Sequence, residues 1–266
     1  MVVLLLKTLN VLFNFMNLCL LLWVINFIIA PKNQQIFRTV FQQILLVILQ
    51  FMKDNLSLVQ AVDCVLLAVK PVYAADVIRE VYDALDNKFV ISIVAGWTYE
   101  MLKDALPDAA RFVRVMPNTP LAVGEGMSLI SSLCTCTDEE FDFAKSVFAA
   151  AGKVAVVEDH VYTPANGISG CGPAFVYAFI EAMADGGVRY GVPRALAYEL
   201  AAQTLVGAAK MVLETGEHPG RLKDAVCSPG GTTIEGMYAL EKGGMRAAVM
   251  DAVGATVEKT MRMAKK

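Results

Sequence analysis

The first fifth of this 266-residue chain lacks two kinds of residue that globular proteins normally use throughout. No acidic residue precedes Asp54, and no glycine precedes Gly96, although the chain contains 19 glycines. The run from Thr8 to Pro31 carries no charge, and a run of that length is a candidate to span a membrane. Four asparagines weaken that interpretation because unpaired amides are costly in hydrocarbon. No small-x-small cleavage site follows the run, which disfavours a signal peptide.

Histidine is scarce and cysteine is scattered, so the sequence predicts no metal site. The chain has only two histidines, which excludes a His-based centre. The two closest of its six cysteines, Cys134 and Cys136, have the spacing neither of a zinc ribbon nor of a thioredoxin-type pair. Scattered thiols predict a reduced, cytoplasmic protein. The net charge of −3 and the absence of a long basic run argue against nucleic acid as a partner.

Apolar runs and helical segments alternate through the middle of the chain. Short apolar runs that end at Gly or Pro are typical of buried parallel strands. This pattern predicts strands over 62–69, 89–94, 111–115, 127–132 and 153–157, and helices over 72–86, 99–106 and 138–151. Strands that alternate with helices in this way favour a parallel sheet covered on both faces.

The pattern after Pro164 is helical, with Gly or Pro between the segments and no strand-like run. Helices are predicted over 173–187, 193–215, 232–242 and 244–264. The predicted fold class is therefore α/β plus all-α. A domain over residues 1–162 contains the parallel sheet, and a second domain over residues 163–266 is all-helical.

The segment 228–236, with the sequence SPGGTTIEG, is the most informative stretch. A Pro followed by two Gly lets main-chain N–H groups converge, and two threonines then open a predicted helix. Amides at a helix N-terminus bind carboxylates or phosphates, because unpaired donors and the helix dipole both favour negative charge. Taken by itself, the segment is more often an ordinary Gly-rich turn with a Thr cap.

Eight motifs in this order and spacing make the chain resemble the pyrroline-5-carboxylate reductase family over about residues 54–266. They are Leu67–Pro71, Ser92–Gly96, Arg114–Pro120, Gly124–Ser128, Ser169–Ala174, Ala182–Gly191, Leu222–Asp224 and the segment 228–236. The resemblance implies a Rossmann-like dinucleotide-binding domain, a helical dimerisation domain, and NADPH or NADH as cofactor. It implies the reduction of 1-pyrroline-5-carboxylate to L-proline, the last step of proline biosynthesis. A small-molecule substrate, a homodimer or higher homo-oligomer, no membrane and a cytoplasmic location are expected.

The same resemblance assigns roles to individual residues. The substrate carboxylate is expected on the amides of Gly231, Thr232 and Thr233, in a bend that Gly230 permits, with the Ser228 hydroxyl as a further donor. Thr233 is also expected to hydrogen-bond the ring nitrogen, so Thr233 and Ser228 are the candidate catalytic residues. The expected cofactor-binding residues are Asn55, Ala68, Val69, Lys70, Pro71, Asn118 and Thr119. Taken alone, Asn55 would pass as a helix cap, and Lys70 as a solvated charge.

The resemblance fails at the N-terminus. Family members begin with a strand and a glycine-rich turn that lets the backbone approach the pyrophosphate. In this chain the stretch from Leu4 to Leu12 has no glycine, and leucine side chains there are expected to block the diphosphate. Three explanations stay open: residue identities that differ from those of the encoded protein, a genuine variant with damaged cofactor binding, or a membrane anchor in place of the Rossmann start.

Two other functions stay open at this point. A non-catalytic oligomeric paralogue with impaired cofactor binding would account for the missing phosphate loop. Another imine or β-hydroxyacid reductase on the same scaffold is the second alternative. Hydroxyacid-acting relatives tend to use a lysine in the helical domain, and neither Lys210 nor Lys223 lies in that motif.

Overall fold

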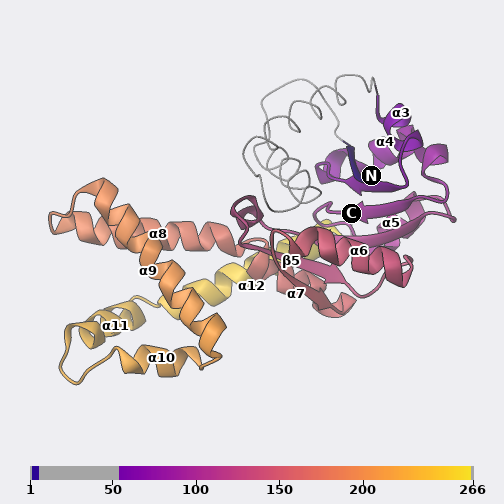
Figure 1. Ribbon diagram of the computed structural model, residues 1–266. Coiled ribbons are helices and arrows are strands. Elements are labelled where there is room, and N and C mark those ends of the chain that lie inside the picture. The colour runs from indigo at the N-terminus through magenta and orange to yellow at the C-terminus, as the bar shows by residue number, and fades with distance from the viewer. Residues whose placement is uncertain (1, 6–53, 265–266) are drawn as a thin grey trace. The chain divides into compact units, whose positions relative to one another are not determined.

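The computed structural model describes residues 2–5 and 54–264 (Figure 1). The chain forms two compact units, one made of Met1–Gly170 with Val257–Lys266 and the other of Cys171–Thr256. The uncharged run and nearly all of the segment where the resemblance fails lie outside the described residues. The predicted domain boundary between residues 162 and 163 stays a prediction.

The first unit is a sheet with helices on both faces. Its described elements are β1 (Val2–Leu5), α3 (Asn55–Gln60), β2 (Cys64–Leu67), α4 (Pro71–Glu80), η1 (Tyr82–Leu85), β3 (Phe89–Ser92), α5 (Tyr99–Ala105), β4 (Arg111–Met116), η2 (Thr119–Val123), β5 (Gly126–Ser131), α6 (Asp138–Ala149), β6 (Gly152–Val157) and α7 (Asp159–Ser169). In this part of the chain the strands are ordered β1-β2-β3-β4-β5-β6, and β1 to β4 are parallel. This confirms the predicted fold class.

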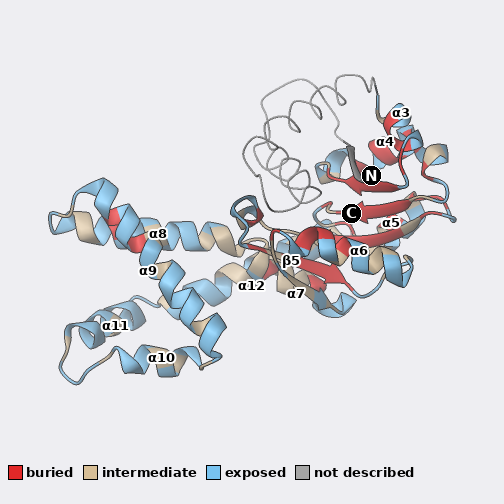
Figure 2. Ribbon diagram, in the orientation of Figure 1, coloured by how far each residue is buried: buried red, intermediate tan, exposed pale blue. Residues whose placement is uncertain are grey.

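Strand β2 shows why the central runs are apolar throughout. All of its residues are buried, and alternate residues enter two different apolar clusters. Val65 packs with Val77 of α4 on one face, whereas Leu66 packs with Val147 of α6 on the other. Burying each such side chain stabilises the fold by about 1.5–3 kcal/mol. Figure 2 shows the buried residues concentrated in this sheet and the helices against it.

One strand pair departs from the all-parallel expectation. Strands β4 and β5 are antiparallel, with Val115 opposite Ile130. Between them lies only the short η2 segment, and a parallel connection needs a crossover of a dozen or more residues, usually a helix. The chain therefore returns antiparallel, and the next pair, β5 and β6, is parallel again because α6 supplies the crossover.

The second unit is helical, as predicted. It contains α8 (Gly172–Arg189), α9 (Arg194–Thr215), α10 (Pro219–Ala225), α11 (Thr232–Lys242) and the first part of α12 (Met245–Met263), whose end belongs to the first unit. Helices α7 and α10 were not predicted. Helix α7 contains a proline at position 164 and a glycine at position 167, which normally indicate a break in a helix. Helix α10 has only seven residues, which is too short for a clear helical pattern.

The second unit has little core of its own. Its buried apolar residues are the small Ala184, Ala197 and Ala201, where α8 and α9 pack closely. Many large apolar side chains on the same helices are exposed, Phe179 and Leu200 among them (Figure 2). The stretch Asp159–Arg189 is long and apolar enough to cross a membrane by length and composition alone. Core helices of soluble proteins meet the same criterion, so this finding does not identify a membrane span. Large apolar side chains exposed in such numbers are typical of an interaction surface.

Candidate functional site

The carboxyl ends of the parallel strands form one edge of the sheet. Because β2, β3 and β4 run in the same direction, the segments that follow them all lie at this edge. These segments are Ala68–Pro71, Ile93–Gly96 and Pro117–Thr119. Ligands of open α/β sheets bind outside the carboxyl ends of the strands. The structure thus brings Lys70 and Asn118 to the same edge.

Lys70 occupies the N-cap position of α4. Its backbone is extended, no side chain caps the helix, and Pro71 stands in the first turn. Proline suits this place because its missing N–H would have no partner within the helix. The Lys70 side chain is exposed, Val69 is half-buried, and Ala68 is buried in the core. Ala68 can therefore contribute only its main chain to a ligand.

Asn118 is held on two sides. Its Nδ2 donates to the carbonyl oxygen of Ser169 at 2.9 Å, and its Oδ1 accepts from the main-chain N–H of Met127 at 2.9 Å. The side chain thus ties the end of β4 to α7 and to β5. It fixes the segment that carries the neighbouring Thr119, whose own side chain is exposed.

Asn55 does not lie with Lys70. Its Nδ2 is 3.3 Å from both carboxylate oxygens of Glu80, the last residue of α4, whereas Lys70 precedes the first. A ten-residue helix is about 15 Å long, so only an extended ligand could touch both. The cap of α3 is also not Asn55: Asp54 accepts the N–H of Ser57 at 2.7 Å.

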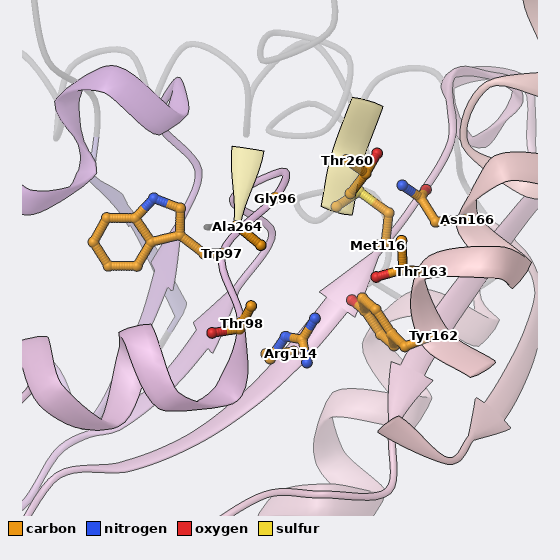
Figure 3. A pocket seen from close by; sticks show the side chains of 10 residues that line it. All are labelled: Gly96, Trp97, Thr98, Arg114, Met116, Tyr162, Thr163, Asn166, Thr260 and Ala264. Carbon is orange, nitrogen blue, oxygen red and sulfur yellow. The ribbon is translucent and has the colours of Figure 1, made fainter. Parts of the chain in front are cut away.

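A small cavity lies just beneath this edge (Figure 3). Its volume is about 20 Å³, and residues from β4, α7, the β3–α5 loop and the end of α12 line it. Gly96, with φ of +78°, turns the chain there, and a Cβ at this position would lie 3.6 Å from Cε of Met263. Sequence reasoning missed the charged member of this lining, Arg114. The available signal was an arginine between two valines inside strand β4.

The bend Ser228–Thr233 lies in the second unit, before α11. Gly230 has φ of +68°, and the N–H of Gly231 donates to the carbonyl oxygen of Ser228 at 3.0 Å. This corrects one expectation, because the Gly231 amide is already bonded and is not a free donor for a carboxylate. Gly231 is the N-cap of α11, and no side chain caps the helix, so the Thr232 and Thr233 amides are its first two.

The bend has the features of an anion cradle. The first-turn amides of an eleven-residue helix face outward, and the helix dipole adds positive potential there. Ser228, Thr232 and Thr233 are exposed, so a ligand can reach them. A Cβ on Gly231 would lie 2.4 Å from Oγ of Ser228, so only glycine lets this hydroxyl sit beside the amides.

The thiols of the described residues are arranged for packing. Burial raises the pKa of Cys64 to about 12, and burial together with a hydrogen bond to Cys134 raises the pKa of Cys136 to about 12. Such thiols stay protonated near neutral pH and are poor nucleophiles. Within residues 2–5 and 54–264, no group of three His, Cys, Asp or Glu side chains is placed to hold a metal ion.

Comparison with known proteins covers both units. Residues 159–263 match the family described as pyrroline-5-carboxylate reductase dimerisation, and residues 25–96 match that described as NADP oxidoreductase coenzyme F420-dependent. The chain is 45% identical over 207 residues to the pyrroline-5-carboxylate reductase of Escherichia coli K12, covering 77% of each chain. It is 43% identical over 211 residues to that of Glycine max, covering 79% of this chain and 77% of the relative.

Solved structures agree with these sequence matches. The pyrroline carboxylate reductase of Plasmodium falciparum with NADP bound has a TM-score of 0.76 at 36% identity, covering 80% of this chain and 81% of that one. The pyrroline-5-carboxylate reductase of Coxiella burnetii has a TM-score of 0.73 at 33% identity, covering 81% of each chain.

Proposed function

This chain belongs to the pyrroline-5-carboxylate reductase family and reduces 1-pyrroline-5-carboxylate to L-proline with NAD(P)H, and from that premise we propose roles for its individual residues. The observation that carries the function is identity of 45% over 207 residues, which is 77% of this chain and 77% of the relative. This chain matches a pyrroline carboxylate reductase structure with NADP bound and a family described as NADP oxidoreductase, so NAD(P)H is the cofactor.

The substrate is a small cyclic imine with one carboxylate. We assign the carboxylate to the bend Ser228–Thr233, where the amides of Thr232 and Thr233 and the hydroxyl of Ser228 donate. Gly230 supplies the left-handed turn, and Gly231 keeps the space beside Ser228 open. Charge-assisted hydrogen bonds of this type are about twice as strong as neutral ones.

Thr233 has a second role in this proposal. Its amide lies in the cradle, and its hydroxyl is exposed on the same turn, so that it can hydrogen-bond the ring nitrogen and help to hold a proton there. Ser228 acts beside it through the carboxylate. The other residues of the bend orient the ring, and positioning with electrostatics supplies most of the rate.

The cofactor supplies the hydride. The described residues fit it, because the uncapped start of α4 presents an exposed lysine at the edge where α/β sheets bind nucleotides. We propose that Lys70 and the main chain of Ala68, Val69 and Pro71 contact the cofactor, with Asn118 and Thr119 contacting it from the next-but-one strand. Asn55 contacts a more distant part, since it lies at the far end of α4.

The protein is a homo-oligomer. The match to a dimerisation family over residues 159–263 and the exposed apolar faces of α8 and α9 both support this. We propose that these faces are covered by a second copy of the chain. We further propose that the protein works in the cytoplasm without a membrane or nucleic-acid partner, which the net charge of −3 favours.

A steady-state assay tests the activity. Purified protein should oxidise NADPH only when 1-pyrroline-5-carboxylate is present, and L-proline should form in equal amount. Analytical ultracentrifugation of the same sample tests the assembly, where a dimer or larger species is expected. Folded, oligomeric protein that binds NADPH but forms no proline would contradict the function and leave the fold assignment intact.

A further inference from the structure

Arg114 is a charged residue inside the sheet. It is the fourth residue of β4, and only 7% of it is exposed. A buried ion costs several kcal/mol unless it is paired and hydrogen-bonded. The electrostatic and ring partners of this guanidinium belong to one element, the helix α7.

These partners lie along one face of α7. Nη1 of Arg114 donates to Oδ1 of Asp159 at 2.6 Å, and its Cζ lies 4.2 Å from the centre of the Tyr162 ring (Figure 3). Asn166 lines the same cavity as Arg114. Positions 159, 162 and 166 share a helical face, since they are separated by three and four residues. Burial also raises the pKa of Tyr162, which keeps its phenol neutral beside the cation.

The far end of the same helix is bonded to the same strand. Asn118, two residues after β4, donates to the carbonyl oxygen of Ser169, the last residue of α7. From residue 114 to 118 an extended chain rises about 13 Å. From residue 159 to 169 a helix rises about 15 Å. Arg114 and Asn118 therefore fasten the two ends of α7 along one strand and its continuation.

Helix α7 needs these contacts to keep its place. Pro164 removes a main-chain donor from the helix interior, and Asn166 and Gly167 are poor helix formers. A helix of this composition has low intrinsic stability, so tertiary contacts must fix its direction. The contacts of Arg114 with Asp159 and Tyr162 fix the direction of α7 on the face that carries these two residues.

Two polar atoms in the cavity have no protein partner among the described residues. They are Nε of Arg114, a donor, and Oδ1 of Asn166, an acceptor. The cavity is about 20 Å³, and about 10–15 Å³ suffices for one water. A buried water can accept from the Arg114 donor or donate to the Asn166 acceptor, so a water in the cavity can satisfy either atom.

We propose that Arg114 is a positioning residue for the cofactor: through its contacts with Asp159 and Tyr162 it sets α7 against β4 and thereby fixes the Asn118–Thr119 segment. This inference rests on the proposed cofactor role of that segment. Arg114 does not touch the cofactor itself, and it acts through the strand that leads to the segment.

The test compares two arginines of one strand. Arg114→Met removes the buried charge, and Arg111→Met is the matched control, because Arg111 also forms an ion pair, with Glu140 at 2.9 Å, at the start of β4. NADPH affinity is measured by fluorescence titration, which does not depend on turnover. We expect the dissociation constant to rise about tenfold or more for Arg114→Met and less than about threefold for Arg111→Met.

Two further measurements make the comparison decisive. If Arg114→Met does not fold, Asp159→Asn replaces it, because this variant keeps the side-chain shape and removes the charge that pairs with Arg114. Its dissociation constant for NADPH is then compared with that of Arg111→Met. Arg114→Lys keeps the charge but cannot present Nη1 and Nε in a fixed plane, so it should restore folding stability more than NADPH affinity. The inference would be overturned if the Arg114 and Arg111 variants lost NADPH affinity equally, or if neither variant lost it. If the wild-type protein bound NADPH but did not form proline, the proposed function would be wrong and the inference about Arg114 would be unaffected.

Discussion

Gly231 is hydrogen-bonded to Ser228 through the main chain, and the Ser228 hydroxyl occupies the space that a side chain at position 231 would need. The N–H of Gly231 donates to the carbonyl oxygen of Ser228 at 3.0 Å, and a Cβ on Gly231 would meet Oγ of Ser228 at 2.4 Å. The two residues thus form a closed turn that places one hydroxyl beside the first amides of α11. We take this turn to be the carboxylate-binding element of the reductase.

Gly231→Ala should therefore damage substrate binding. The added methyl forces the Ser228 hydroxyl away from the amides, and we expect the KM for 1-pyrroline-5-carboxylate to rise about tenfold, by the loss of about one hydrogen bond to a charged group. Gly236→Ala is the matched control, because a Cβ there meets open space. That control should keep the KM and gain up to about 1 kcal/mol of stability, since alanine favours a helix interior. Equal KM values for the two variants would contradict the role of the turn.

Thr233→Val should lower turnover. Valine keeps the shape and the amide of Thr233 but removes the hydroxyl, so kcat is expected to fall about 10²-fold while NADPH affinity is unchanged. Thr232→Val serves as the control one residue away, and its kcat should change less than about threefold by the same reasoning. Loss of NADPH binding with normal kcat in Thr233→Val would show that the hydroxyl serves the cofactor instead.

Lys70→Met should weaken NADPH binding and make it less sensitive to salt. An exposed cation at the start of α4 attracts phosphate through water, and that attraction is screened above about 0.1 M salt. We expect the dissociation constant to rise about fivefold at low salt and to approach that of the wild type at high salt. Titrations at two ionic strengths, with Lys103→Met of α5 as control, measure this. An affinity loss that is independent of salt would argue against a phosphate contact.

Cys64 should make the protein sensitive to high pH. Its pKa is raised from 9.0 to about 12 by burial, so the folded protein favours the protonated thiol. The corresponding stability is complete below pH 9.0, the pKa in the unfolded chain, and is lost as the pH rises toward 12. The melting temperature of Cys64→Ala should be lower than that of the wild type at pH 7 and approach it above pH 9. A difference that stays constant with pH would contradict this.

The sequence could predict β2 and β3 because each is buried on both faces. The runs that contain Cys64–Leu67 and Phe89–Ser92 are buried throughout, so neither run has a polar face. The Pro or Gly after each run marks its end. The antiparallel pairing of β4 and β5 could not be predicted from strand composition, since it follows from the length of the connection between them.

Some site residues could likewise be predicted from the local sequence, whereas others depend on how the chain folds. The bend before α11 could be predicted, because glycines and threonines at a helix start have a local chemical meaning. The internal bond of the Gly231 amide could not, since it depends on how the turn closes. Arg114 and α7 were missed for a related reason. The partners of Arg114 lie about 45 residues further along the chain, and α7 depends on them more than on its own composition.

The most direct test of the account follows a single deuterium atom. The purified wild-type protein is given 1-pyrroline-5-carboxylate and NADPH that carries deuterium at C4 of the nicotinamide, and the products are analysed by mass spectrometry. The account predicts L-proline that carries one deuterium at the former imine carbon, in equal amount to the NADP⁺ formed. Proline without the label, or no proline from folded protein that binds NADPH, would contradict it.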